Sequence, residues 1–126
     1  MSDVFLVVDD DQGARSSFSY LLKYGFPDSQ ILEASNGKEA LELFIANPGI
    51  SLVFTDHQMP RMTGIDLTKK IRLSDQKVKI VVTSGFEGIL TPALEAGANA
   101  FIAKPPSPQD VIKIVEELFR TEELEE

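Results

Sequence analysis

The chain has 126 residues, with 20 acidic and 12 basic side chains and a formal net charge of −8. This length predicts one domain, and a hydrophobic content of 43% is enough for that domain to bury a core. The absence of cysteine and the single histidine exclude a disulfide scaffold, a zinc-thiolate site, a cysteine nucleophile and a multi-histidine metal site. The acidic balance argues against direct nucleic-acid binding, and no apolar run is long enough to cross a membrane, so we expect a cytoplasmic protein.

Five short apolar runs alternate with stretches of helical periodicity. The runs are rich in β-branched and aromatic residues, and four of them lack clean alternation, which is typical of strands buried on both faces of a parallel sheet. In chain order, we expect strands at 4–8, 31–32, 52–54, 78–82 and 101–103, and helices over 12–25, 37–46, 64–71, 92–96 and 108–118.

Four of these helices are preceded by residues that favour a helix start. Two carry the spacing of a capping box, in which a polar side chain bonds the backbone N–H three residues later. Two others place a hydroxyl residue before a proline at the first helical position, where the missing N–H needs no partner. The signals are Asn36 with Glu39, Thr63 with Asp66, Thr91 before Pro92, and Ser107 before Pro108.

Five strand–helix repeats predict an α/β fold with one five-stranded parallel sheet. Right-handed crossovers then place helices on both faces of that sheet. Ligands of such sheets bind outside the carboxyl ends of the strands, near the point where the strand order reverses. The residues that follow each strand are therefore the first place to look for a functional site.

Polar side chains follow four of the five expected strands. Carboxylates at one edge repel each other, so a bound cation would stabilise them, and carboxylate and carbonyl oxygens suit Mg²⁺. A lysine and hydroxyl groups beside them would make the edge suitable for phosphoryl chemistry with a carboxylate nucleophile. The residues are Asp9, Asp10 and Asp11 after the first strand, Asp56 after the third, Thr83 and Ser84 after the fourth, and Lys104 after the fifth.

Each of these residues also has an ordinary structural interpretation. The three aspartates at 9–11 can cap the first helix, Asp56 can begin a turn, and Lys104 can be a solvated lysine at a strand end. We expect His57 to be an exposed loop residue beside the site rather than a ligand or a base. The functional interpretation rests on several such groups meeting at one edge of the sheet.

Taken together and in this order, the motifs resemble the receiver domain of two-component response regulators over about residues 4–119. The resemblance implies a flavodoxin-like doubly wound sheet with strand order 2-1-3-4-5. It also implies a receiver domain over 1–120 and an acidic C-terminal tail over 121–126. The resemblance is carried by residues 6–11, by 56–60 with Gly64, by Thr83-Ser84, by 96–98, by Phe101 and by Lys104-Pro105.

The resemblance implies a part in phosphotransfer for the acidic residues. Asp56 would be the phosphoacceptor. Asp10 would bind Mg²⁺ directly, Asp9 would bind it directly or through water, and the backbone carbonyl of Gln58 would complete the metal site. Asp11 is not expected to contact the metal.

The resemblance also implies a conformational switch. Lys104 would pair with the phosphoryl group, and a cis peptide bond between Lys104 and Pro105 would aim the lysine into the site. Thr83 would hydrogen-bond a phosphoryl oxygen and move inward, which opens space that Phe101 can fill. Because Phe101 has no hydroxyl group, switching at this position would be steric and apolar.

The sequence departs from the family pattern near the expected output surface. Pro106 stands where the family often has an aromatic residue. Residues 85–90 include two glycines, and Pro92 is expected to delay the fourth helix and leave it short. We therefore expect the surface around this helix to be rearranged.

Three other functions compete with this interpretation. A Mg²⁺-dependent aspartyl-phosphate hydrolase needs a second aspartate two residues after the nucleophile, and that position is Gln58. A flavodoxin binds a phosphate after the first strand, where the aspartates at 9–11 would repel it unless a metal intervened. A receiver that is never phosphorylated is the third alternative, but every expected site residue is present.

As a receiver, the chain is not expected to be an enzyme but a phosphoacceptor that assists its own phosphotransfer and dephosphorylation. The donor would be a sensor histidine kinase or a histidine phosphotransfer protein, and the downstream target is unknown. No effector domain follows residue 119, so we expect a stand-alone regulator or a receiver cut from a longer protein. Ile112, Val115 and Phe119 are either part of a wide buried face or part of a phosphorylation-dependent homodimer surface on the fourth helix, fifth strand and fifth helix.

Overall fold

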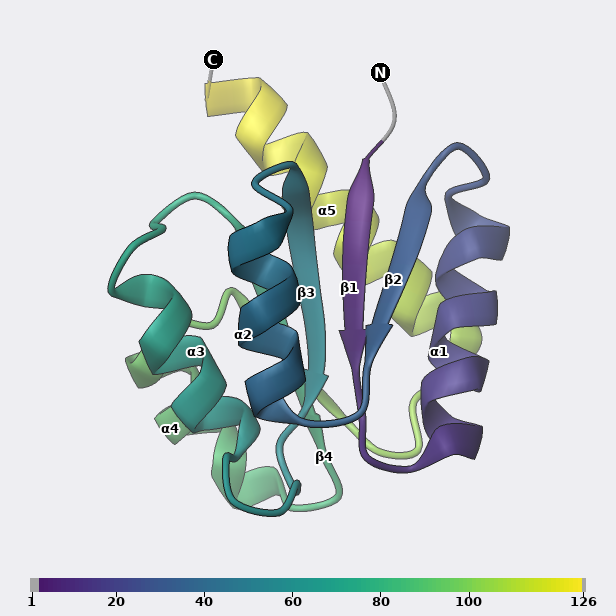
Figure 1. Ribbon diagram of the computed structural model, residues 1–126. Helices are drawn as coiled ribbons and strands as arrows, with labels where there is room; N and C mark the ends of the chain where they lie inside the picture. Colours follow the sequence, from purple (N-terminus) through teal and green to yellow (C-terminus); the bar gives the residue numbers. More distant parts are fainter. Residues whose placement is uncertain (1–2, 126) are drawn as a thin grey trace.

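A single parallel sheet lies between two layers of helices (Figure 1). The computed structural model describes the backbone of residues 3–125 and the side chains of residues 3–120. In chain order, the elements are β1 (Val4–Val8), α1 (Gln12–Gly25), β2 (Gln30–Ala34), α2 (Gly37–Ala46), β3 (Ile50–Asp56), α3 (Gly64–Arg72), β4 (Lys79–Ser84), the 3₁₀ helix η1 (Glu87–Ile89), α4 (Leu90–Ala96), β5 (Ala100–Ala103) and α5 (Pro108–Glu125).

The strand order is β2-β1-β3-β4-β5, and every neighbouring pair is parallel. The predicted doubly wound sheet is therefore confirmed. All carboxyl ends meet at one edge, which is the lower edge of the sheet in Figure 1. The register pairs Asp56 at the end of β3 with Thr83 of β4, and Thr83 with Ile102 of β5. The topology thus brings together residues that are far apart in the chain.

Each face of the sheet has its own apolar core, because both faces are covered by helices. One core packs β-strand side chains against α1 and α5, and within it the Phe18 and Phe54 rings lie 4.8 Å apart. The other packs the opposite face against α2, α3 and α4. The interior strands carry several of the largest fully buried side chains, which include Phe5, Leu6, Leu52 and Phe54.

The second apolar stripe of the last helix belongs to the interior of the domain. The ring of Phe119 stacks on that of Phe5 in β1, with 5.9 Å between the centroids. Ile112 packs so closely on the end of α1 that a Cβ placed on Gly25 would lie 2.9 Å from its Cγ1 atom. Ile112 and Phe119 therefore contribute to the wide apolar face of α5, and both side chains stay partly exposed. The homodimer surface stays a prediction.

Three of the four predicted helix starts are confirmed. The Asn36 side chain accepts from the Glu39 N–H, Thr63 and Asp66 form a reciprocal capping box, and the Ser107 hydroxyl accepts from the Asp110 N–H. The prediction that Thr91 caps the fourth helix is wrong. That helix begins at Leu90, because the 3₁₀ turn η1 leads directly into it.

The fourth helix is nevertheless as short as expected. It spans seven residues and ends at Gly97, which adopts a left-handed conformation with φ 114°. Pro92 falls within the first turn, where the absence of its N–H costs no helical hydrogen bond. Pro92 therefore does not delay the helix.

The last helix reaches Glu125, so most of the backbone in the predicted acidic tail at 121–126 continues α5. The side chains of this tail lie outside the described residues, and its boundary at residue 120 stays a prediction. None of the helices within residues 3–125 is long and apolar enough to cross a membrane.

A close approach between α3 and the end of β3 makes Gly64 sensitive to substitution. A Cβ at this position would lie 2.5 Å from the carbonyl oxygen of Asp56 and 2.9 Å from the Cα of His57. We expect Gly64→Ala to lower the free energy of unfolding by about 1–3 kcal/mol, since backbone atoms would have to shift. Urea unfolding would measure this, with Gly49→Ala as control, because no heavy atom lies within 4 Å of a Cβ there. Equal stabilities for the two variants would contradict the prediction.

Candidate functional site

The predicted site residues come together at the carboxyl edge of the sheet. Asp9 and Asp10 directly follow β1, Asp56 is the last residue of β3, Thr83 lies near the end of β4, and Lys104 follows β5. The strands bearing Asp56 and Thr83 are longer than their apolar runs predicted, because each continues to the polar residues at the edge. The structure therefore confirms that these groups meet in space.

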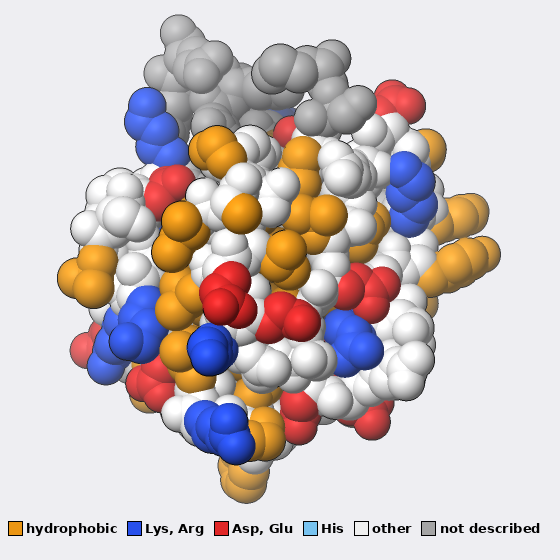
Figure 2. All heavy atoms as spheres, in the orientation of Figure 1, with side chains coloured by type: hydrophobic (Ala, Val, Ile, Leu, Met, Phe, Trp, Pro, Cys, Tyr) orange, Lys and Arg blue, Asp and Glu red, His pale blue; other side chains and the backbone are white. Residues whose placement is uncertain are grey.

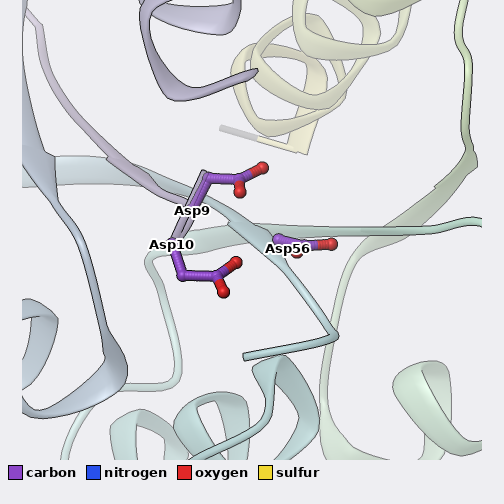
Figure 3. Close-up of side chains that lie close together, drawn as sticks. All are labelled: Asp9, Asp10 and Asp56. Carbon is purple, nitrogen blue, oxygen red and sulfur yellow. The ribbon is translucent and has the colours of Figure 1, made fainter. Parts of the chain in front are cut away.

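Three carboxylates lie within reach of one cation. Each of Asp9, Asp10 and Asp56 offers an oxygen, and these atoms lie within 4.8 Å of one another. Figure 3 shows the first two side chains on the segment after β1 and the third on β3, with all three pointing in the same direction. An all-oxygen donor set from carboxylates fits a hard divalent cation such as Mg²⁺.

Lys104 supplies a positive charge to this cluster. Its Nζ lies 3.1 Å from Asp56 Oδ1 and 3.2 Å from Asp9 Oδ2. The side chain of Asp56 is 7% exposed and that of Asp9 is 2% exposed, so both carboxylates are largely shielded from water. The peptide bond between Lys104 and Pro105 is cis, as predicted. One ammonium group cannot neutralise three carboxylates, which leaves the edge attractive to a further cation.

Burial and charge shift the pKa values of the paired groups. Burial raises the pKa of Asp56, and the charges of Asp9 and Asp10 add to this effect, while the hydrogen bond from Lys104 opposes it. For Lys104, burial alone would lower the pKa, but its contacts with Asp56 and Asp9 together raise it above its usual value. Lys104 therefore keeps its proton at neutral pH and favours the charged form of Asp56.

The hydroxyl group of Thr83 is poised without a partner. Its Oγ1 atom is buried and has no hydrogen-bond partner among the described residues. A buried hydroxyl group usually has a hydrogen-bond partner. The unpaired hydroxyl of Thr83, which lies in register with Asp56, is therefore available to donate to an acceptor bound there. Phe101 on β5 pairs in register with Val82 of β4. Its side chain is half-buried against the core on the face that α2, α3 and α4 cover.

The loop between β3 and α3 is shaped around Asp56. Met59 is buried in the core, and the carbonyl of His57 accepts hydrogen bonds from the N–H groups of Met59 and Gly64. Gln58, whose carbonyl is the predicted metal ligand, lies between these anchors with an exposed side chain. The prediction that His57 is exposed is wrong, since the residue is half-buried. Its backbone N–H donates to the Thr83 carbonyl oxygen, which holds it against β4.

Two side chains near the cluster, those of Asp11 and Arg15, bind backbone groups. Asp11 caps α1, with its Oδ2 accepting from the Ala14 N–H at 2.8 Å, which confirms its ordinary structural interpretation. Arg15, which the sequence did not single out, donates from Nη1 to the carbonyl oxygen of Asp9 at 2.8 Å. The sequence signal for Arg15 was weak, since an arginine in a first helical turn is usually solvated.

Comparison with known proteins agrees with this geometry. The family model of the response regulator receiver domain matches residues 5–116. A chemotaxis protein CheY homolog of Campylobacter jejuni is 36% identical over 121 residues, which are 92% of each chain. The two-component response regulator ORR5 of Oryza sativa is 35% identical over 119 residues, 91% of this chain and 87% of its own.

A solved structure gives the same result. The crystal structure of the CheX-CheY-BeF3-Mg²⁺ complex from Borrelia burgdorferi contains a chain that matches with a TM-score of 0.84 and 27% identity. The match covers 93% of this chain and 89% of that one. The chain belongs to the response regulator receiver domain family, and it is a phosphoacceptor switch of two-component signal transduction.

The pKa of Asp56 predicts how stability depends on pH. A raised pKa means that the native state holds this proton more tightly than the unfolded chain, so ionisation lowers stability as pH rises from 3.8 through the raised value. We expect metal-free Asp56→Asn to melt at a higher temperature than the wild type at pH 7. The advantage should vanish below the unfolded pKa, where Asp56 of the wild type is protonated in both the native and the unfolded state.

Asp66→Asn is the matched control for this experiment. Hydrogen bonds from the backbone and hydroxyl of Thr63 lower the pKa of Asp66, so its ionised form stabilises the fold above pH 3.8. The control should therefore melt at a lower temperature at pH 7. Thermal unfolding followed by circular dichroism would measure both variants. The pH range should run from about 3 to about 8, because it then brackets the ordinary carboxyl pKa of about 4. A shift of the same sign in the two variants would contradict this account.

Proposed function

We propose that Asp56 is the residue that accepts the phosphoryl group. It pairs with Lys104 at 3.1 Å and lies in register with Thr83, whose hydroxyl is free. A phosphoryl group on Asp56 would therefore find both a cation and a donor beside it. Asp9 is less suitable because its Oδ1 already accepts from the Asp11 N–H and its Oδ2 lies 3.2 Å from Lys104.

The transfer step follows from this arrangement. A carboxylate oxygen of Asp56 attacks phosphorus in line, an O–P bond forms, and the N–P bond to the donor imidazole breaks. The released imidazole takes a proton from solvent. Lys104 neutralises charge on the phosphoryl oxygens during the transfer. We also propose that water later attacks the same phosphorus, which returns the Asp56 carboxylate and releases inorganic phosphate.

We propose that the acidic cluster holds Mg²⁺ through Asp9, Asp10, Asp56 and the backbone carbonyl of Gln58. The donor set supports this, because three carboxylates meet within 4.8 Å and one lysine only partly balances them. The Borrelia CheY complex, which is named for both beryllofluoride and Mg²⁺, adds further support. When bound, the ion would supply charge neutralisation to the phosphoryl oxygens.

We propose that Thr83 and Phe101 carry the conformational response. A phosphoryl group adds about one to two negative charges and three acceptor oxygens, and the unpaired hydroxyl of Thr83 is a neutral donor in register with Asp56 on the adjoining strand. An inward shift of Thr83 would change packing along β4 and β5. Phe101 lies on that strand pair and lines a surface groove of about 460 Å³ with Ile114 of α5.

The phosphodonor would dock beside the active aspartate. A groove of about 790 Å³ runs between α1 and the segment after Lys104, and apolar side chains line most of it. Tyr20 and Tyr24, which border the groove, are 75% and 72% exposed. Figure 2 shows apolar side chains projecting at the α1 side of the molecule. We propose a sensor histidine kinase or histidine phosphotransfer protein as the partner at this groove.

We propose that the output surface lies on α4, β5 and α5 and that a second phosphorylated copy occupies it. Leu90 and Leu94, one helical turn apart on α4, are 44% and 46% exposed. Their exposure leaves an apolar stripe on α4, and the groove that Phe101 lines lies between β5 and α5. Light scattering with and without beryllofluoride and Mg²⁺ would test this, since a monomer under both conditions would contradict the dimer.

The identity of the phosphoacceptor can be tested by intact mass measurement. We expect incubation with acetyl phosphate and Mg²⁺ to add one phosphoryl group to the wild type and none to Asp56→Asn. Removal of Mg²⁺ with a chelator should abolish the adduct. Asp11→Asn is the matched control, because Asp11 caps α1 and lies outside the cluster, so its adduct should persist. An equal adduct on Asp56→Asn would refute the proposed acceptor.

A further inference from the structure

Arg15 binds the backbone between two members of the acidic cluster. Its Nη1 donates to the carbonyl oxygen of Asp9 at 2.8 Å, and its Nε lies 3.1 Å from Oε1 of Glu33 on β2. The Arg15 side chain is 16% exposed, so the guanidinium is held in place rather than moving freely in solvent. These contacts tie α1, the end of β1 and β2 together at the site.

The contact with Arg15 completes the restraint on the peptide group that joins Asp9 to Asp10. The Asp9 N–H donates to the Ala34 carbonyl at 3.2 Å, which continues the pairing of β1 with β2. On the other side of Asp9, the carbonyl is fixed by Arg15. Because a peptide group is planar, fixing this carbonyl also fixes the direction in which Asp10 leaves the strand.

Asp10 depends on this backbone restraint more than its neighbours do. The carboxylate of Asp9 contacts both the Asp11 N–H and Lys104, and that of Asp56 contacts Lys104. Asp10 is exposed, and its carboxylate accepts no hydrogen bond from the described part of the chain. Its place within 4.8 Å of the other two carboxylates is therefore set through the main chain.

We propose that Arg15 is a positioning residue that aims Asp10 at the cation by clamping the peptide between Asp9 and Asp10. This inference rests on the proposed Mg²⁺ site. The effect of charge alone has the opposite sign, because removing a positive charge near the cluster would strengthen attraction for a cation. Weaker Mg²⁺ binding after loss of Arg15 would therefore report lost geometry rather than changed charge.

Arg72 provides a matched control at the opposite end of the sheet. Its guanidinium donates to the carbonyl oxygens of Gly97 and Asp75 and to Oδ1 of Asn99. Arg72 thus binds backbone as Arg15 does, but it ties the end of α3 to the segments before β4 and β5. Loss of Arg72 should lower thermal stability without changing the cation site.

The test measures Mg²⁺ binding by titration calorimetry with magnesium chloride. We expect Arg15→Ala to raise the dissociation constant about tenfold, as is common when a residue that orients a metal ligand is lost. Arg15→Lys should also raise it, because an ammonium cannot hold the Asp9 carbonyl and Glu33 with two separate N–H groups at fixed angles. Arg72→Ala should leave it unchanged. An unchanged or lower dissociation constant in Arg15→Ala, or full recovery in Arg15→Lys, would overturn the proposal.

A second measurement separates this inference from the metal site itself. In metal-free protein, ¹⁵N relaxation of the Asp10 amide should show a lower order parameter in Arg15→Ala than in the wild type or Arg72→Ala. If the wild type fails to bind Mg²⁺ but this loosening occurs, the clamp stands and the proposed metal site fails. If the Asp10 order parameter is the same in all three proteins, the clamp is refuted whatever the metal does.

Discussion

Mutual repulsion among three carboxylates is the constraint around which this domain is arranged. Asp9, Asp10 and Asp56 place oxygens within 4.8 Å of one another at the end of two neighbouring strands. A single ammonium, that of Lys104, contacts two of them. The remaining negative charge would attract a divalent cation, as the proposed Mg²⁺ site requires, and the same charge would repel a phosphoryl donor if no cation were bound. The proposed phosphotransfer and the proposed metal binding therefore both depend on one charge imbalance.

The rest of the fold keeps these charges where they are. Two apolar cores hold the five strands in register, so that the ends of β1, β3, β4 and β5 meet at one edge. Close packing of Gly64 against the Asp56 carbonyl shapes the loop that carries Gln58. Arg15 restrains the backbone on the other side of the cluster. Much of the local structure thus serves to oppose a repulsion that would otherwise spread the carboxylates apart.

The sequence predicted the features that depend on short-range patterns. Apolar runs located every strand, and helix starts at Asn36, Thr63 and Ser107 were correct because each depends on a side chain that bonds a backbone group three residues away. The Thr91 cap failed because a 3₁₀ turn, which no local signal marked, supplied the helix start instead. The site residues were predicted in combination, since their convergence follows from the parallel topology.

Contacts that depend on how whole elements pack against one another were beyond prediction. Whether Ile112 and Phe119 faced solvent or the interior depended on how closely α5 approaches Gly25 and Phe5. The link between Arg15, the Asp9 carbonyl and Glu33 likewise depends on the relative placement of α1 and β2. Such contacts are set by the packing of complete elements, and the spacing of residues along the chain does not encode them separately.

The most direct test of the central claim is a crystal structure with Mg²⁺ and beryllofluoride, a mimic of the phosphoryl group. We predict beryllium bound to a carboxylate oxygen of Asp56, the metal ion beside Asp9, Asp10 and Asp56, and Lys104 and Thr83 in contact with fluorine atoms. The same experiment on Asp56→Asn should show no beryllofluoride at this edge. Beryllofluoride attached to another residue, or a metal ion bound away from the three aspartates, would contradict the account.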